Sequence, residues 1–280
     1  MKKLLSIFTM TVLTITTSTN IIACNNSNVP IPTINTVKFK LMDRIKEATA
    51  LAVDTKGNLY ASDKKGNIYK CLTGENEFKK FATINIETEY NKTIIKIDND
   101  DNFLIINNQK IYKCLAKEES FQEIFNFNES IWSITVDKNN NIYTGSSTGK
   151  LYKCSAGENI FSEVTNIQRL ISSIVIDKNN NIFLLSIIVQ QDSEIYKCLA
   201  GESTFNKIAE IEKPFIDFTL DKNNNIYIID NGISVYKMLS NNKDIHVINN
   251  QLFFGNNTII TDQKNKFYIS NSYYGVYKSD

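Results

Sequence analysis

The chain contains a single histidine, His246, and shows no excess of either charge, with 31 Lys and Arg against 30 Asp and Glu. One histidine and the lack of any Cys-x-x-Cys spacing exclude a zinc site built from cysteine and histidine. A net charge of +1 supplies neither a basic stripe for nucleic acid nor an acidic tail for a cationic partner. We therefore expect no nucleic-acid partner, no metal and no cofactor.

Proline (3) and glycine (10) are scarce, while asparagine makes up about one residue in eight. The asparagines fall at turn positions rather than in one tract, which favours an A- and T-rich genome over a prion-like segment as the explanation. After the first two dozen residues no apolar run is long enough to span a membrane. The remaining 255 or so residues are enough for one large all-β domain.

The N-terminus is typical of an export signal. Lys2 and Lys3 precede a short apolar, threonine-rich segment at residues 4–17, which is too short for a membrane-spanning helix. The sequence Ile-Ile-Ala-Cys that ends at Cys24 resembles the lipobox of bacterial lipoproteins. This resemblance implies transfer of a diacylglyceryl group to the Cys24 thiol, cleavage before Cys24 and, in some bacteria, acylation of the new N-terminus, with palmitate as a typical acyl chain. The alternative is an ordinary secretory signal with an incidental cysteine.

Three segments follow from this interpretation. We expect residues 1–23 to be a lipoprotein signal peptide, 24–34 a polar tether and 35–280 the folded domain. Acyl chains on Cys24 would hold the domain on the extracellular face of the cell membrane, with membrane lipid as its partner.

The tripeptide Tyr-Lys-Cys recurs along the chain at a nearly constant interval. Full copies begin at Tyr69, Tyr112, Tyr152 and Tyr196, and degenerate copies at Tyr236 and Tyr277. An aspartate that opens an asparagine-rich turn keeps the same interval, at Asp54, Asp98, Asp137, Asp177, Asp221 and Asp262. Each series spans 208 residues in five steps, a mean period of 41.6. Strand-rich repeats of roughly 40–45 residues are typical of propeller blades.

The third repeat shows the expected blade most clearly. Strands are predicted at residues 131–136, 142–144, 150–154 and 161–164, with asparagine- and glycine-rich turns between them. Both strand parities carry apolar residues, as expected where both faces of a sheet pack against neighbours. Six copies predict an all-β fold, a six-bladed β-propeller of four-stranded antiparallel blades.

The two ends of the domain complement each other. The sixth repeat has no fourth strand, whereas an unassigned strand-like run, residues 36–42, precedes the first repeat. We expect this N-terminal strand to close the last blade, because the pairing removes edges that would otherwise stay open.

Four cysteines occupy the same position in different repeats: Cys71, Cys114, Cys154 and Cys198. Blade rotation places such positions too far apart for disulfides, which need Cα atoms within about 7 Å. We expect four reduced, buried thiols that act as small apolar side chains.

The turn from Asp54 to Tyr60, with copies in which Asn replaces Gly57, resembles the repeat unit of NHL-type six-bladed propellers, a superfamily that includes streptogramin lyase-like and gluconolactonase-like enzymes. The resemblance covers the chain from about residue 36 and implies the fold rather than an activity. Lyase-type members use histidine, and gluconolactonase-type members hold a divalent cation with carboxylate and asparagine. In this chain His246 falls in an expected outer strand and Asp217 is the one carboxylate near the start of an inner strand, so we expect no catalytic residue.

The Asp-Lys-Asn-Asn-Asn turns start like a calcium-binding EF-hand loop. They have isoleucine at the sixth position, where that loop needs glycine, and no glutamate at the twelfth. A hairpin turn capped by its own aspartate is the favoured interpretation.

Ligands of such propellers usually meet the loops between the fourth strand of one blade and the first of the next, and these loops vary most in this chain. The candidate ligand-binding residues are Tyr90, Trp132, Arg169, Phe215, Asp217 and Phe253. Trp132, the only tryptophan, is suited to stack on a sugar or to anchor a protein contact. Its alternative role is to plug the channel among core side chains.

We expect a monomeric, non-catalytic, lipid-anchored surface propeller that recognises an extracellular protein or glycan. One alternative is an exported lyase or lactonase-like hydrolase, and another is a structural coat protein.

Overall fold

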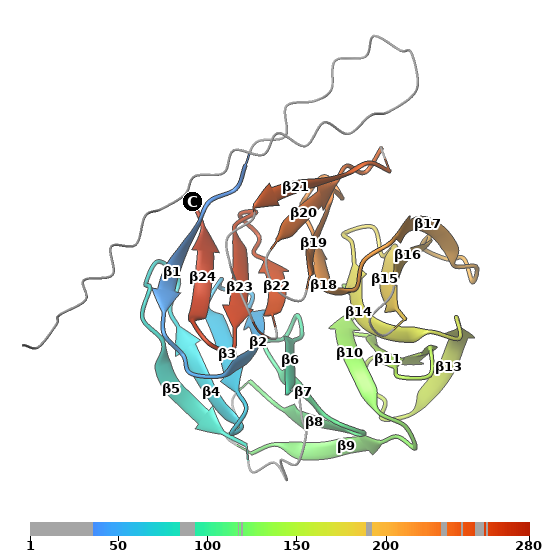
Figure 1. Ribbon diagram of the computed structural model, residues 1–280. Coiled ribbons are helices and arrows are strands. Elements are labelled where there is room, and N and C mark those ends of the chain that lie inside the picture. Colours follow the sequence, from blue (N-terminus) through green and yellow to red (C-terminus); the bar gives the residue numbers. More distant parts are fainter. Residues whose placement is uncertain are drawn as a thin grey trace, which may run out of the picture. The chain divides into compact units, whose positions relative to one another are not determined.

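The computed structural model describes residues 36–84, 93–116, 118, 120–188, 192–230, 234–241, 243–249, 255 and 257–280. These residues form six four-stranded sheets arranged around a central axis (Figure 1). The part of the chain that is described contains no α-helix, and so none that is long and apolar enough to cross a membrane. The predicted all-β, six-bladed propeller is confirmed.

In each of the first three blades the strands follow one another from the axis outward. Blade 1 consists of β2 (Ala48–Val53), β3 (Leu59–Asp63), β4 (Asn67–Cys71) and β5 (Lys79–Thr83). Blade 2 consists of β6 (Ile94–Ile97), β7 (Phe103–Asn107), β8 (Lys110–Cys114) and β9 (Gln122–Asn126). Blade 3 consists of β10 (Ile131–Val136), β11 (Ile142–Ser146), β12 (Lys150–Cys154) and β13 (Phe161–Asn166).

The other three blades continue the ring. Blade 4 consists of β14 (Leu170–Ile176), β15 (Ile182–Ile187), β16 (Ser193–Cys198) and β17 (Asn206–Ile211). Blade 5 consists of β18 (Phe215–Leu220), β19 (Ile226–Asp230), β20 (Val235–Met238) and β21 (Ile245–Asn249). Blade 6 consists of β22 (Asn257–Thr261), β23 (Phe267–Asn271), β24 (Gly275–Ser279) and β1 (Phe39–Asp43).

The core lies between the blades. Every residue of the second strands β3, β7, β11 and β23 is buried, on both faces of the sheet. Each core cluster joins residues of two neighbouring blades, as where Phe103 of blade 2 packs with Tyr60 of blade 1. Stability therefore depends on contacts between blades as much as on pairing within them.

The N-terminal strand closes blade 6, as predicted. β1 pairs antiparallel with β24, with Phe39 opposite Ser279 and Leu41 opposite Tyr277. The Asp280 amide also donates to the Lys38 carbonyl at 3.1 Å. The observed strand, residues 39–43, lies within one to three residues of the predicted run. This pairing joins the two ends of the described chain.

The aspartate turns cap themselves through hydrogen bonds. Asp137 Oδ1 accepts from the amides of Asn139 and Asn141 at 2.9 Å, and its Oδ2 accepts from Asn141 Nδ2 at 2.7 Å. The fourth position of the turn has a positive φ, +62° at Asn140 and +79° at Gly57, which asparagine and glycine tolerate best. The interpretation of these segments as hairpin turns is confirmed.

The four repeat cysteines are buried and unpaired, as predicted. Burial raises the pKa of each thiol above its ordinary value, and the Sγ of Cys154 donates to the Glu158 carbonyl at 3.1 Å. These thiols are core groups rather than reactive ones.

Candidate functional site

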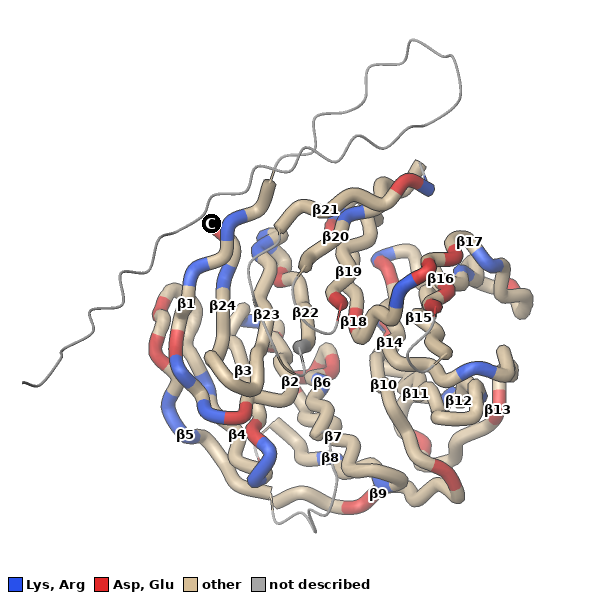
Figure 2. The backbone as a smooth tube through the Cα atoms, in the orientation of Figure 1, with Lys and Arg blue, Asp and Glu red and all other residues tan. Residues whose placement is uncertain are grey.

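The central channel is a cavity that residues of all six blades line. Its walls are the inner strands β2, β6, β10, β14, β18 and β22, and its volume is about 290 Å³. Hydroxyl groups line it at Ser133, Ser172, Ser173, Thr219, Thr258 and Thr261, interspersed with alanine, valine and isoleucine. Figure 2 shows the charged residues of the propeller gathered mainly on outer strands and turns. The channel is therefore a polar but weakly charged site.

Trp132 lies on the channel wall with 40% of its surface exposed. A β-bulge explains its orientation. Ile131 pairs with Ser146 and Ser133 with Gly145, so Trp132 between them has no partner in the ladder. A bulge bends the strand and re-aims the unpaired side chain. The same irregularity in β14 leaves Ser172 unpaired, and its side chain also lines the channel.

Asp217 also lines the channel, but hydrogen bonds hold its carboxylate to the blades. Its Oδ2 accepts from the hydroxyl of Thr258 and, at 3.0 Å, from the amide of Ile259 in blade 6. Its Oδ1 accepts from the amide of Phe218 at 2.9 Å. The residue is 9% exposed. A carboxylate that accepts from three donors is occupied in joining blades 5 and 6.

Lys96 is the second charged residue of the channel, and sequence reasoning missed it. It is the third residue of β6 in blade 2. Burial lowers the pKa of Lys96, and the negative charge of Asp217 offsets this lowering in part. Blades 2 and 5 are three apart in a ring of six, so the two charges face each other across the axis. A signal was present, because Lys96 and Asp217 are the only ionisable residues in the six inner strands.

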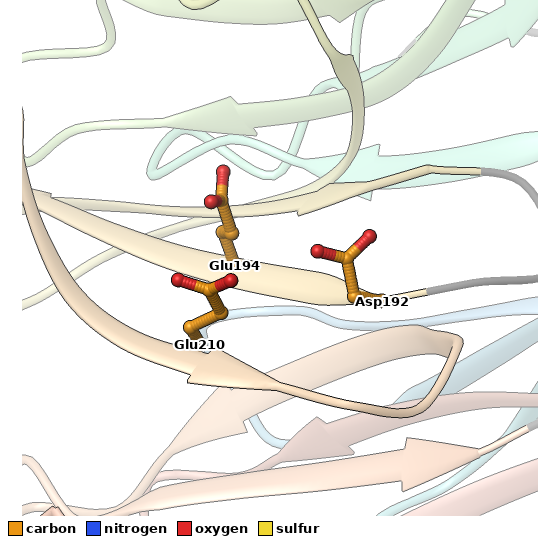
Figure 3. Close-up of side chains that lie close together, drawn as sticks. All are labelled: Asp192, Glu194 and Glu210. Carbon is orange, nitrogen blue, oxygen red and sulfur yellow. The ribbon is translucent and has the colours of Figure 1, made fainter.

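Arg169 lies at the start of blade 4 and is paired within that blade. Its Nη1 is 3.1 Å from Glu194 and 3.4 Å from Asp192. Asp192, Glu194 and Glu210 converge as Figure 3 shows, and Lys207 bridges Glu194 and Glu210 at 2.9 and 2.6 Å. Two cations therefore already pair with the three carboxylates. Arg169 serves this network rather than offering a free charge to a ligand.

Phe215 is a core residue. It is completely buried at the start of β18, and its ring meets that of Tyr236 edge-on with centroids 4.9 Å apart. Phe215 was expected to contact a ligand; the structure instead packs its side chain inside the blade, where it has no exposed surface. Tyr90, Phe253 and Cys24 lie outside the described residues. His246 lies in the outer strand β21, far from the axis, as expected.

Comparison with known proteins supports the fold. No protein-family model matches the chain, and no curated protein matches it in sequence. Among solved structures, a streptogramin B lyase superposes with a TM-score of 0.62 at 10% identity, over 88% of this chain and 98% of the lyase.

Two further structures are similar to the same extent. A gluconolactonase from Xanthomonas campestris has a TM-score of 0.66 at 9% identity, over 87% of this chain and 89% of its own. An auxiliary nutrient binding protein from Bacteroides thetaiotaomicron has a TM-score of 0.64 at 10% identity, over 85% of this chain and 69% of its own. The chain thus resembles streptogramin lyase-like propellers in fold, and its structural neighbours include both enzymes and a binding protein.

Proposed function

We propose that this protein is a non-catalytic binding propeller that takes up a small hydroxylated ligand, such as a sugar, in its central channel. The observation that carries the proposal is the exposed ring of Trp132 on a channel wall rich in hydroxyl groups. A volume of about 290 Å³ is close to the lower end of the roughly 300–1,000 Å³ range of small-molecule sites, so the ligand is small.

The channel hydroxyls are suited to receive hydrogen bonds from a sugar. Ser133 Oγ donates to the Ile171 carbonyl at 3.1 Å, and Ser172 Oγ donates to the Leu185 carbonyl at 3.2 Å. Their protons are used within the protein, while lone pairs on both oxygens can accept from ligand hydroxyls. Aromatic and apolar walls with a few placed polar groups are typical of small-molecule sites.

The hydrogen bonds that occupy the channel carboxylate, Asp217, favour a binding role over catalysis. Asp217 is held by three donors and is the one channel-lining carboxylate among the described residues. General acid–base hydrolysis commonly uses two carboxyl groups or a histidine near the substrate. We further propose that lipid on Cys24 holds the propeller at the extracellular face of the membrane, where the channel meets extracellular ligands.

Isothermal titration calorimetry with a panel of monosaccharides tests this function. We expect at least one sugar to bind the wild type, and Trp132→Ala to weaken that binding by at least about tenfold, because a buried aromatic anchor contributes more than 1 kcal/mol. Trp132→Phe keeps an aromatic ring and serves as the matched control, with affinity retained within a few fold. Binding that Trp132→Ala leaves unchanged would show that this tryptophan only fills the channel.

A hydrolase or lyase is the second candidate, favoured by the streptogramin B lyase and the gluconolactonase among the structural neighbours. Turnover of a lactone that requires an added divalent cation, and that Asp217→Asn abolishes, would favour this candidate over the binding role.

A further inference from the structure

The alternation of β6 places Lys96 at the channel wall. All four residues of β6 border the channel; Ile95 and Ile97 are buried in the core between blades 1 and 2, while Lys96, of the opposite parity, stays half-buried at the channel wall. The equivalent position, two residues before the turn aspartate, is uncharged in the other blades, where it holds Ala52, Thr135, Val175, Thr219 and Ile260. The blade fold therefore does not require a cation at this position.

The side chain of Lys96 lines the channel. It makes no hydrogen bond or ion pair with any residue in the described part of the chain. Asp217 is the one group whose charge acts on it, and the oxygens of Asp217 are occupied by Thr258, Ile259 and Phe218. A half-buried charge with no partner among the described residues is costly, and a ligand that supplies the opposite charge relieves that cost.

The surroundings of Lys96 favour a single negative charge on the ligand. One lysine is a point charge that suits a carboxylate, while a phosphate dianion is usually held by several cations or by a row of backbone amides. Asp217 adds a negative charge across the axis, which disfavours a dianion further. Hydroxyl groups elsewhere on the wall suit the rest of a sugar ring.

We propose that the channel ligand is a sugar acid, or a hydroxylated monocarboxylate of similar size, whose carboxylate pairs with the ammonium group of Lys96. This inference rests on the proposed binding function and adds the chemical class of the ligand. In this proposal Trp132 contacts the ring of the ligand, and Lys96 makes the channel prefer an acidic sugar over a neutral one.

Calorimetry on the full-length chain with matched pairs of sugars tests the inference. The probes are D-glucuronate against D-glucose, and D-galacturonate against D-galactose. We expect the acidic member of a pair to bind at least tenfold more tightly to the wild type. Lys96→Met should remove this preference, while Lys178→Met should keep it, because Lys178 is an exposed turn residue outside the channel.

The fold of the variants is checked by thermal unfolding followed by near-UV circular dichroism. Lys96→Met removes an unpaired charge from the channel, so we expect a melting temperature at or above that of the wild type. A lost preference in a protein with this melting behaviour reports on binding rather than on unfolding.

The outcomes separate the two proposals. Equal affinity for acidic and neutral sugars, or a preference that survives Lys96→Met, overturns the role of Lys96 and leaves the binding function standing. Tighter binding of D-glucose 6-phosphate than of D-glucuronate overturns the assignment to a monocarboxylate. If none of these sugars binds the wild type, both proposals are wrong.

Discussion

The tyrosine of the repeated Tyr-Lys-Cys tripeptide ties an acidic residue to its blade. Tyr196 donates to Glu194 at 2.6 Å in blade 4, and Tyr152 donates to Glu129 at 2.5 Å in blade 3. The same bond joins Tyr236 to an aspartate of β19 at 2.9 Å. Burial and the neighbouring carboxylate raise the pKa of Tyr196 to about 12, so the phenol keeps its proton and remains a donor.

The lysine of the tripeptide covers an aromatic ring on the preceding strand of its blade. Lys153 lies 5.5 Å from the centroid of Tyr143, and Lys197 lies 5.1 Å from that of Phe183. Each of these residue pairs is directly opposite in the antiparallel ladder. The methylene groups of the lysine pack on the ring and its ammonium group makes a cation–π contact. The side chain therefore covers a partly buried strand while its charge stays in water.

Glu194 should support stability in a pH-dependent way. Burial raises the pKa of its carboxyl, but the bond from Tyr196 and the charges of Lys207 and Arg169 outweigh burial, so the pKa lies below its ordinary value of 4.5. The stability that the charge of Glu194 contributes is fully present above pH 4.5, and it is lost as the pH falls through the lowered pKa of the folded state. We expect Glu194→Gln to destabilise by about 1–3 kcal/mol near neutral pH, and this difference to shrink in acid.

Urea unfolding of the wild type and Glu194→Gln between neutral and acid pH measures this difference. Glu163→Gln is the matched control, because its side chain is 45% exposed and its one ion pair is with Lys150 at 3.7 Å; we expect a change within about 0.5 kcal/mol. A Glu194→Gln effect that stays constant with pH would show that shape, not charge, matters at this position.

The closing strand β1 couples the two ends of the described chain through one side chain in particular. Phe39 is 6% exposed and packs with Ile259 and Phe267 of blade 6. Leu41, two residues further on the same strand, is 42% exposed. Both residues pair with β24, so they differ in burial rather than in backbone hydrogen bonding.

Phe39→Ala should therefore destabilise the propeller by about 3–5 kcal/mol, the usual cost of deleting a buried phenylalanine side chain. Leu41→Ala alters the same strand at an exposed site, and we expect a loss of less than about 1 kcal/mol. Chemical denaturation of both variants gives the comparison. Similar losses would mean that β1 contributes only its backbone pairing.

At the scale of the whole molecule, the chain enters the ring at a different place from the central channel. β1 is the outermost strand of blade 6, so the described chain enters the ring at the rim, while the inner strands surround the channel (Figure 1). An anchor that precedes β1 in sequence would therefore join the ring through its rim and not through the channel wall.

If Cys24 carries lipid, Cys24→Ser should move the protein from the membrane fraction to the soluble fraction and leave sugar affinity unchanged. Each buried methylene of an acyl chain contributes about 0.8 kcal/mol to membrane binding, so losing the chains is decisive. Cell fractionation, with mass spectrometry of the N-terminal peptide, measures both location and lipid. Cys114→Ser, a buried core position, should stay with the membrane. Membrane retention of Cys24→Ser would argue against lipid on this residue.

Much of the fold could be predicted because its signals are local. The turn around Asp137 needs residues no further away than Asn141, and each blade repeats it. Four strands per blade follow from the spacing of such turns, and closure by β1 follows from the strand missing at the other end. The burial of Phe215 could not be predicted in the same way, because it depends on packing against Tyr236, 21 residues away.

The amino-acid order alone was sufficient for the number of blades, their strands, their turns and the reduced cysteines. Strands and turns depend on neighbours within one repeat, and the number of blades and the separation of the cysteines follow from the recurrence of that repeat. Three-dimensional closure determined which side chains share the channel. Lys96 and Asp217 are separated by 121 residues, and their charges act on each other across the channel only because a ring of six places blades 2 and 5 opposite each other. The bulge that turns Trp132 toward the axis likewise arises from pairing between β10 and β11, which no single residue type encodes.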